Sequence, residues 1–372
     1  MKVAILGSGA IGLASAALLS ANGHSPCLWS PSGAGTASLG PVATVTSTGA
    51  HAGTFEVTTA RRIEEALEGA EAVLVAVDAG GHGAVMEAAA PVLQSHQVVI
   101  VGAAHAMSAV HLSELLAARG VSLPIVSWNT TAATAHKTGL AAVDIRTVRP
   151  RIEASVMPAA LAARGLALCR ALLPAHFEAR ADALAIALLS NSNPVFHVPV
   201  CLFNITRIAL AETWAPYAQT TAEVGAMMEA LDAERLATAA AYGHSIHSVN
   251  AHFHRSFRIP EGPMSQMCGA LAAAGRGPKG PTRLDHRYFT QDIPYGLSFT
   301  ETLARQAGLA TPVHRAMIDL ADVALRRDHR ADNVLTVRMG LHALDPAQIL
   351  ILARDGHFGP QDAADPKTTR TA

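Results

Sequence analysis

The sequence predicts a two-domain protein, an α/β domain with a parallel, doubly wound sheet followed by an all-α domain. The chain has 372 residues, which suggests about two domains at roughly 150 residues each. Up to about residue 180, short apolar β-type runs alternate with helical segments, and this alternation implies a parallel sheet covered by helices. Beyond it, long Ala-, Leu- and Met-rich stretches contain almost no β-type runs. We therefore expect domains at 1–180 and 181–372.

The expected elements follow from local composition. Short apolar runs bounded by turn residues predict strands at 2–6, 24–29, 72–77, 98–101 and 124–126, with a weaker β tail at 152–157 and 176–179. High Ala and Leu content predicts helices at 12–21, 110–118, 183–189, 222–242, 299–307 and 313–325. The Gly/Pro-rich segment 275–281 is expected to be a loop, 326–330 a solvated face, and the polar end 362–372 frayed.

Composition disfavours several kinds of partner. Twenty-eight basic and 29 acidic residues give a net charge of −1, so no net field attracts nucleic acid or anionic lipid, and only 4% of residues are aromatic. No run reaches the ~18 unbroken apolar residues of a membrane span. The four cysteines are Cys27, Cys169, Cys201 and Cys268. They are widely spaced and form no C-x-x-C pair, which disfavours a disulfide framework and a structural zinc site. We expect a cytoplasmic protein with small-molecule partners and no metal. The sequence does not decide whether the protein forms a homo-oligomer.

A G-x-G-x-x-G motif follows the first predicted strand and opens a helix. Its residues are Gly7, Ser8, Gly9, Ala10, Ile11 and Gly12. In such a turn the first glycine permits the tight bend, the second lets a pyrophosphate approach the backbone, and the third lets helix and strand pack closely. The motif lies at the chain start with strand, turn, helix and second strand in place. It predicts a dinucleotide site in a Rossmann domain.

The choice of cofactor depends on the end of the second strand. A carboxylate there would bind the ribose 2′-hydroxyl of NAD, but the chain reads Trp29-Ser30-Pro31-Ser32. A 2′-phosphate would meet no repulsion, and Ser30 and Ser32 could donate hydrogen bonds to it. Because no arginine lies in that loop, NADP(H) is only modestly favoured over NAD(H), and FAD is less favoured still.

Two segments of the second half contain the residue types for acid–base chemistry. His197 follows Asn193-Pro194, although a lone histidine among apolar residues is more often structural. Arg287 and Asp292 lie five residues apart, too far for one helical face, so a kink near Pro294 must orient them if they act together. The same cluster is also plausible as a surface ion-pair region.

A histidine-rich stretch, His247, His252 and His254, is disfavoured as a metal site. No nearby cysteine or carboxylate completes a ligand set there. A polar helix end or loop is the simpler interpretation.

Together these segments resemble the opine (octopine/nopaline-type) dehydrogenase family over nearly the whole chain. The most specific signal is H-R-Y-x-x-Q-D-I-P-Y-G, from His286 to Gly296. The resemblance implies NAD(P)H-dependent reductive condensation of an amino acid with a 2-oxo acid, pyruvate or 2-oxoglutarate, through an imine, and the reverse oxidation. It also implies that His197 and Asp292 form a catalytic dyad and that Arg287 binds the carboxylate of the 2-oxo acid. An imidazole suits proton transfer near neutral pH, and a guanidinium can bind a carboxylate bidentately.

The chain departs from the family pattern in two places, at Asp78 and in the segment 128–137, which ends in His136-Lys137. Both lie where the nucleotide and nicotinamide are expected. Two other functions fit the same plan. One is a single-substrate NAD(P)-dependent 2-oxo- or 3-hydroxy-acid reductase, which would need no amine. The other is a non-catalytic NAD(P)-sensing protein, which would bind the cofactor without turnover.

Overall fold

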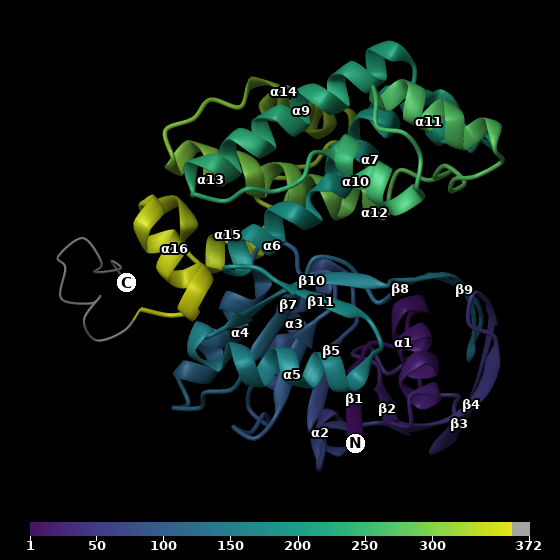
Figure 1. The fold of residues 1–372 in the computed structure, drawn as a ribbon, viewed down its shortest axis with the longest axis vertical. Coiled ribbons are helices and arrows are strands. Elements are labelled where there is room, and N and C mark those ends of the chain that lie inside the picture. Colours follow the sequence, from purple (N-terminus) through teal and green to yellow (C-terminus); the bar gives the residue numbers. More distant parts are fainter. Residues whose placement is uncertain (359–372) are drawn as a thin grey trace. The chain divides into compact units, whose positions relative to one another are not determined.

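The computed structural model describes residues 1–358 and contains two compact units (Figure 1). The first comprises Met1–Ile186 together with the segment from Leu350 onward, and the second comprises Ala187–Ile349. The sequence predicted the domain boundary at residue 180 and assigned all of 181–372 to the helical domain. Part of that end packs on the α/β unit, because a Cβ at Gly356 would lie 2.6 Å from the Met157 sulfur. The segment 362–372 lies outside the described residues.

The first unit is built on one sheet with the order β11-β10-β7-β6-β5-β1-β2-β4-β3-β9-β8. Pairing is parallel from β7 through β1 to β4, which confirms the predicted parallel sheet. The strands are β1 (Lys2–Leu6), β2 (Ser25–Trp29), β3 (Val42–Gly49), β4 (Gly53–Ala60), β5 (Ala72–Val75), β6 (Val98–Val101), β7 (Ile125–Trp128), β8 (Ala133–Gly139), β9 (Ala142–Val148), β10 (Arg151–Met157) and β11 (His176–Ala179).

Four of these strands were not predicted: β3, β4, β8 and β9. They form the antiparallel pairs β3–β4 and β8–β9. Threonine and serine occupy many of their positions, so no continuous apolar run marks them. The available signal was alternation, since along β3 the side chains from Val42 to Thr48 are exposed and buried in turn.

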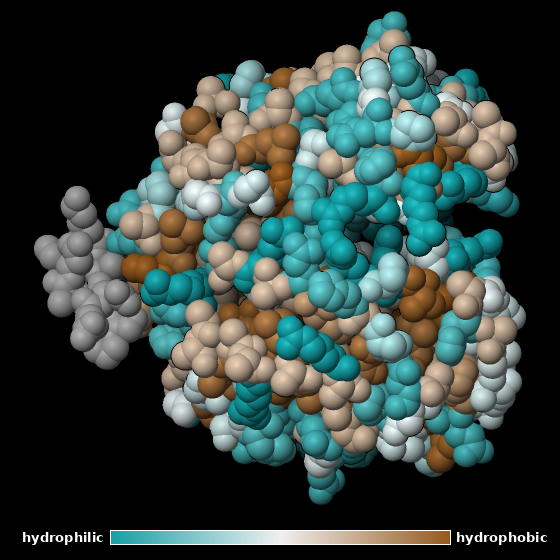
Figure 2. Space-filling view, viewed as in Figure 1, coloured by the Kyte–Doolittle hydropathy of each residue, from teal (hydrophilic) through white to brown (hydrophobic). Residues whose placement is uncertain are grey.

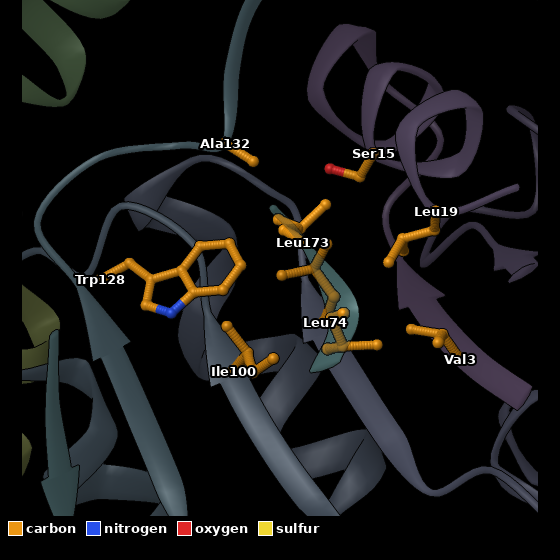
Figure 3. Close-up of a pocket in the computed structure, with 9 residues that line it drawn as sticks. Val3, Ser15, Leu19, Leu74, Ile100, Trp128, Ala132 and Leu173 are labelled. Carbon is orange, nitrogen blue, oxygen red and sulfur yellow. The ribbon is translucent and has the colours of Figure 1, made fainter. Parts of the chain in front are cut away.

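Helices α1 and α4 of this unit match the two predicted ones, whereas α3 and α5, of 11 residues each, were not predicted. The helices are α1 (Ala10–Ala21), α2 (Ile63–Leu67), α3 (Ala79–Ala89), α4 (Ser108–Ala117), η1 (Ala159–Leu161) and α5 (Ala162–Leu172). A cavity of about 10 Å³ lies in the core (Figure 3). It is lined by Val3, Ser15, Leu19, Leu74, Ile100, Trp128, Ala132, Leu172 and Leu173. A space of this size holds one water at most, so it is not a substrate site.

The second unit is helical, as predicted. Helix α9 packs against α7, α11 and α14, around a core that includes Met228, Leu231 and Phe289. The helices from residue 183 onward are α6 (Ala183–Ser190), α7 (Ser192–Leu202), α8 (Ile205–Ala209), η2 (Tyr217–Gln219), α9 (Ala222–Ala241), α10 (Val249–Phe257), α11 (Met264–Ala273), α12 (Arg287–Thr290), η3 (Ile293–Ser298), α13 (Phe299–Gln306), α14 (Pro312–Leu325), α15 (Val334–Arg338), η4 (Leu341–Ala343) and α16 (Pro346–Asp355).

The helical run Ala183–Leu202 is long and apolar enough to cross a membrane, but 94% of its most apolar window is buried inside the protein. It is therefore placed as a core helix would be. On the face shown in Figure 2, hydrophobic residues are scattered among hydrophilic ones. The apolar half of the composition is thus largely in the interior of the two units.

The prediction that 326–330 is a solvated face holds for Arg326, Arg327 and Asp328, which are exposed, and is wrong for His329. His329 is fully buried, with its Nδ1 2.6 Å from an oxygen of Asp322. Arg330 forms two hydrogen bonds, of 2.6 and 2.8 Å, with the Glu301 carboxylate and one with Asp319. Carboxylates from α13 and α14 neutralise this segment, and the sequence alone did not identify these partners.

Candidate active site

The glycine-rich turn connects β1 to α1. Gly7 has a φ of +137°, and a Cβ on it would overlap the Ala76 carbonyl oxygen. A Cβ on Gly12 would overlap the Gly7 carbonyl oxygen, so this glycine lets α1 lie against the turn. Gly9 is different, because it is exposed and a Cβ there would meet nothing within 4 Å. Two glycines therefore serve packing and one leaves open space, the arrangement that a pyrophosphate needs.

The start of α1 is suited to an anion. Ala10 and Ile11 belong to its first turn, which contains no acidic residue, and the N-cap Gly9 supplies no side-chain hydrogen bond. The first N–H groups of a helix have no partner within the helix, and the helix dipole adds partial positive charge there. A phosphate is the ligand that this end favours.

Three serines gather beside the turn. Ser30 Oγ accepts a 3.2 Å hydrogen bond from the Gly35 N–H and lies 3.5 Å from Ser32 Oγ. A Cβ on Gly35 would overlap Ser8 Oγ, so the loop after β2 packs closely against the turn. Ser30 is buried and Ser32 is exposed. The structure thus places Ser8, Ser30 and Ser32 together at the end of β2.

Substitutions at two of these glycines should separate packing from ligand binding. Gly12→Ala must displace backbone, and we expect it to destabilise the fold by about 1–3 kcal/mol. Gly9→Ala meets no protein atom, so we expect an unchanged melting temperature and an NAD(P)H dissociation constant raised about 10-fold or more. Thermal unfolding and titration of nicotinamide fluorescence measure the two effects. Undiminished affinity in Gly9→Ala would contradict a cofactor site at this turn.

His197 and Asp292 meet in the helical unit although 95 residues separate them. His197 Nδ1 lies 2.6 Å from Asp292 Oδ2, and both residues are buried. His197 lies on α7, and Asp292 precedes η3. A Cβ on Gly296 would overlap Pro194 Cγ, so η3 and α7 are in close contact. The Asn191 amide adds a 3.2 Å hydrogen bond to the Gly296 carbonyl oxygen.

The expected kink near Pro294 is present as the wide turn η3, which follows α12 after Gln291. It buries Asp292 in the helical unit, whereas Arg287 is exposed at the first position of α12. The cluster is therefore not simply a surface ion-pair region. The ion pair at the surface is Arg283 with Asp285, and Arg287 forms none with any residue of 1–358.

Tyr288 connects the groups of the site through its ring. It stacks on His197 with 3.7 Å between ring centroids and 17° between planes. His286 meets the same ring edge-on at 4.4 Å, and the Arg287 guanidinium carbon lies 5.1 Å from its centre. The imidazole of His197 is thus held by a ring stack and by Asp292 at Nδ1. No described residue hydrogen-bonds Nε2, so this nitrogen is free to exchange a proton.

Burial dominates the electrostatics of this group. Burial lowers the pKa of His197, the Asp292 carboxylate opposes that effect, and the Arg287 charge adds to it, so the pKa lies below its ordinary value. Burial also lowers the pKa of His286 and raises the pKa of Tyr288 to about 12. His197 is therefore neutral at pH 7 and can accept a proton, while Tyr288 keeps its own.

A pocket of about 460 Å³ adjoins this cluster. It is lined by Lys279, Gly280, Pro281, Thr282, Arg283, Asp285, His286 and Arg287. Asp285 neutralises Arg283 through hydrogen bonds of 2.9 and 2.6 Å. Lys279 and Arg287 make no ion pair with any described residue. Two cations are therefore left to attract an anionic ligand.

The loop with Lys279 is held in place by Trp214. The Gly280 N–H donates to the Trp214 carbonyl oxygen, and the Trp214 indole N–H donates to the Pro281 carbonyl oxygen, both at 2.8 Å. A Cβ on Gly280 would overlap the indole ring. The sequence predicted this loop but did not identify Lys279 as a site residue. The available signal was a cation between Pro278 and Gly280 in a segment rich in glycine and proline.

The histidines at 247, 252 and 254 have other contacts. His254 Nδ1 lies 2.7 Å from the Ile259 carbonyl oxygen, and Arg255 contacts the His247 ring. Within residues 1–358, no group of three or more His, Cys, Asp or Glu side chains could hold a metal ion.

Comparison with known proteins agrees with both halves of this description. Residues 180–325 match the family model for the α-helical domain of NAD/NADP octopine/nopaline dehydrogenase, and residues 2–108 match the N-terminal model of NAD-dependent glycerol-3-phosphate dehydrogenase. An opine dehydrogenase from Arthrobacter sp. (strain 1C) is 26% identical over 288 residues, which is 76% of this chain and 79% of that protein.

Solved structures share the fold. An octopine dehydrogenase with NADH and L-arginine superposes with a TM-score of 0.77 at 18% identity, over 96% of this chain and all of that one. A yersinopine dehydrogenase with NADP⁺ superposes with a TM-score of 0.70 at 18% identity, over 95% and 98% of the two chains. The family model of the helical domain, the curated relative and the fold agree: this chain is similar to NAD(P)-dependent opine dehydrogenases in both of its domains.

Proposed function

We propose that the protein is an opine dehydrogenase that joins the amine of an amino acid to the carbonyl of a 2-oxo acid and reduces the resulting imine with NAD(P)H. The observation that carries this proposal is the buried His197–Asp292 pair, which the Tyr288 ring connects to Arg287 in the lining of a pocket with two cations free of ion pairs. The pair suits proton transfer, and the pocket suits a product with two carboxylates. Pyruvate and 2-oxoglutarate are the proposed 2-oxo acids.

His197 is the proposed proton carrier. As a neutral base it takes a proton at Nε2 from the ammonium group of the amino acid, and Asp292 stabilises the imidazolium. The free amine then attacks the carbonyl carbon. The imidazolium returns this proton to the carbonyl oxygen, which becomes a hydroxyl group. His197 then carries a second proton from the attached nitrogen to that hydroxyl, which leaves as water, so this stage yields an iminium, water and neutral His197.

Reduction completes the reaction. With the dinucleotide bound at the Gly7–Gly12 turn through its pyrophosphate, its nicotinamide would supply the hydride that converts the iminium into a secondary amine. Arg287 holds the carboxylate of the 2-oxo acid through its planar guanidinium. Lys279, the second cation of the pocket, is placed to hold the carboxylate of the amino acid. The charges of the product and the pocket are then complementary.

NADP(H) is the proposed preferred cofactor. The end of β2 presents Ser30 and Ser32 and no carboxylate, so a 2′-phosphate meets no repulsion there. A cytoplasmic location is proposed as well. All four cysteines are free and buried, which suits a reducing compartment.

The direct test is oxidation of NADPH and NADH with pyruvate or 2-oxoglutarate and a panel of amino acids. We expect turnover only when both organic substrates are present, and a higher kcat/KM with NADPH. Turnover that persists without the amino acid would indicate a single-substrate reductase. Tight cofactor binding with no turnover for any pair, in either direction, would indicate a sensing protein and contradict the proposal.

A further inference from the structure

We propose that Lys137 contacts a phosphate group of the bound dinucleotide, and so supplies the cation that the loop after β2 lacks. This inference goes beyond the proposed reaction, because it depends on cofactor binding and not on the substrates. It identifies a cofactor-binding residue outside the glycine motif. The residue comes from the β8–β9 hairpin, which local sequence did not predict.

The position of the ammonium group carries the proposal. Lys137 Nζ donates a 3.0 Å hydrogen bond to the carbonyl oxygen of Ser8, the middle residue of the Gly7-Ser8-Gly9 turn. Strand β8 packs against α1, which begins directly after that turn (Figure 1). The hairpin therefore brings a positive charge to the open space at Gly9. The N–H groups at the start of α1 and the ammonium would act on the same anion.

No described side chain neutralises this charge. Lys137 makes no ion pair within residues 1–358. Asp144 on the partner strand β9 is held by Arg146 at 2.8 Å and by Thr48 at 3.3 Å. An ammonium group has three hydrogens, and the Ser8 carbonyl oxygen uses one. Two donors remain for phosphate oxygens.

The cofactor loop has no cation of its own. From Ser30 to Gly40 the chain contains no lysine and no arginine. The polar groups there, Ser30 and Ser32, can hydrogen-bond a phosphate but cannot neutralise it. A cation from β8 resolves this shortage. The ligand chemistry is a dinucleotide phosphate, either the diphosphate shared by both nicotinamides or the 2′-phosphate that only NADP(H) carries.

Lys137→Met removes the charge and keeps most of the side-chain volume. We expect its dissociation constant for the cofactor to rise about 10-fold, a moderate value because the side chain is exposed. Lys137→Arg should recover most of the affinity. Arg146→Met removes one positive charge from the same hairpin without touching the turn, and should change affinity by about twofold or less.

Titration of nicotinamide fluorescence with NADPH and NADH distinguishes the two phosphates. Equal weakening for both in Lys137→Met assigns Lys137 to the diphosphate. Weakening for NADPH alone assigns it to the 2′-phosphate. Unchanged affinity for both, in a variant with an unchanged melting temperature, overturns the proposal. Because binding is measured without substrates, the result stands whether or not opine formation is observed.

Chemical labelling supplies a second readout on the unaltered protein. The chain has four lysines: Lys2, Lys137, Lys279 and Lys367. Acetylation with an amine-reactive ester, followed by mass spectrometry, reports each one separately. NADPH should protect Lys137 several-fold, while Lys2, at the opposite end of β1 from the turn, keeps its reactivity. Equal acetylation of Lys137 with and without cofactor would overturn the contact.

Discussion

Replacing His197 with Ala lowers kcat by about 10²- to 10⁴-fold while the protein stays folded. The reason is the loss of the group that takes the proton from the amino acid's ammonium and returns it to the departing oxygen. His197→Gln, which retains more of the side-chain volume against Tyr288, should be impaired to a similar degree. Steady-state kinetics with saturating substrates measures the effect, and circular dichroism checks the fold.

A matched control is His342→Ala, which removes an exposed histidine from the same unit and should leave kcat unchanged.

The pH profile of kcat is a further readout of the role of His197. Activation of the amine needs neutral His197, and burial together with Arg287 lowers its pKa. The acid limb of the wild-type profile should therefore lie below the ordinary histidine pKa of about 6.5. Near-normal kcat in both His197 variants would remove this residue from the mechanism.

Replacing Arg287 with Met raises the KM for the 2-oxo acid by about 10²-fold, because a bidentate, charge-assisted carboxylate contact is lost. Stability should change little, since Arg287 is exposed and forms no ion pair with any described residue. Arg287→Lys should recover only part of the loss, because an ammonium cannot reproduce the planar fork. Initial rates at varied 2-oxo acid and saturating amino acid measure the effect.

Lys279→Met is the matched variant for this experiment, because it removes the other cation of the same pocket. It should raise the KM for the amino acid more than that for the 2-oxo acid.

The Arg287 charge lowers the pKa of His197, so in Arg287→Met that pKa rises and the acid limb of the pH–rate profile moves to higher pH. An unchanged KM for the 2-oxo acid in Arg287→Met would refute the assigned role.

Much of the nucleotide-binding unit could be predicted from local sequence. The glycine turn is determined by sterics within a few residues of Gly7 and Gly12, and the apolar runs that became β1, β5 and β6 are buried strands of the parallel sheet. In the helical unit the Ala- and Leu-rich composition was sufficient to predict α9 and α14. These features depend on interactions close in the chain or on average composition, which a sequence displays directly.

Other features depend on which distant segments meet. Strands β8 and β9 lack an apolar run, so neither the hairpin nor the approach of Lys137 to Ser8 was predicted. Arg330 is paired with Glu301 of another helix, and buried His329 has Asp322 as its partner, so the segment 326–330 resembles a solvated one only when it is taken alone.

The proposed catalytic pair depends partly on local sequence and partly on contacts between distant segments. The residue types, the glycine turn and the H-R-Y-x-x-Q-D-I-P-Y-G block can be recognised in the sequence. They indicate the resemblance to opine dehydrogenases and the candidates His197, Arg287 and Asp292. That His197 and Asp292 share a hydrogen bond, and that Arg287 faces a pocket with Lys279, follows only from packing. The contact of Gly296 with Pro194 joins segments about a hundred residues apart, and such contacts form only when the helical core closes.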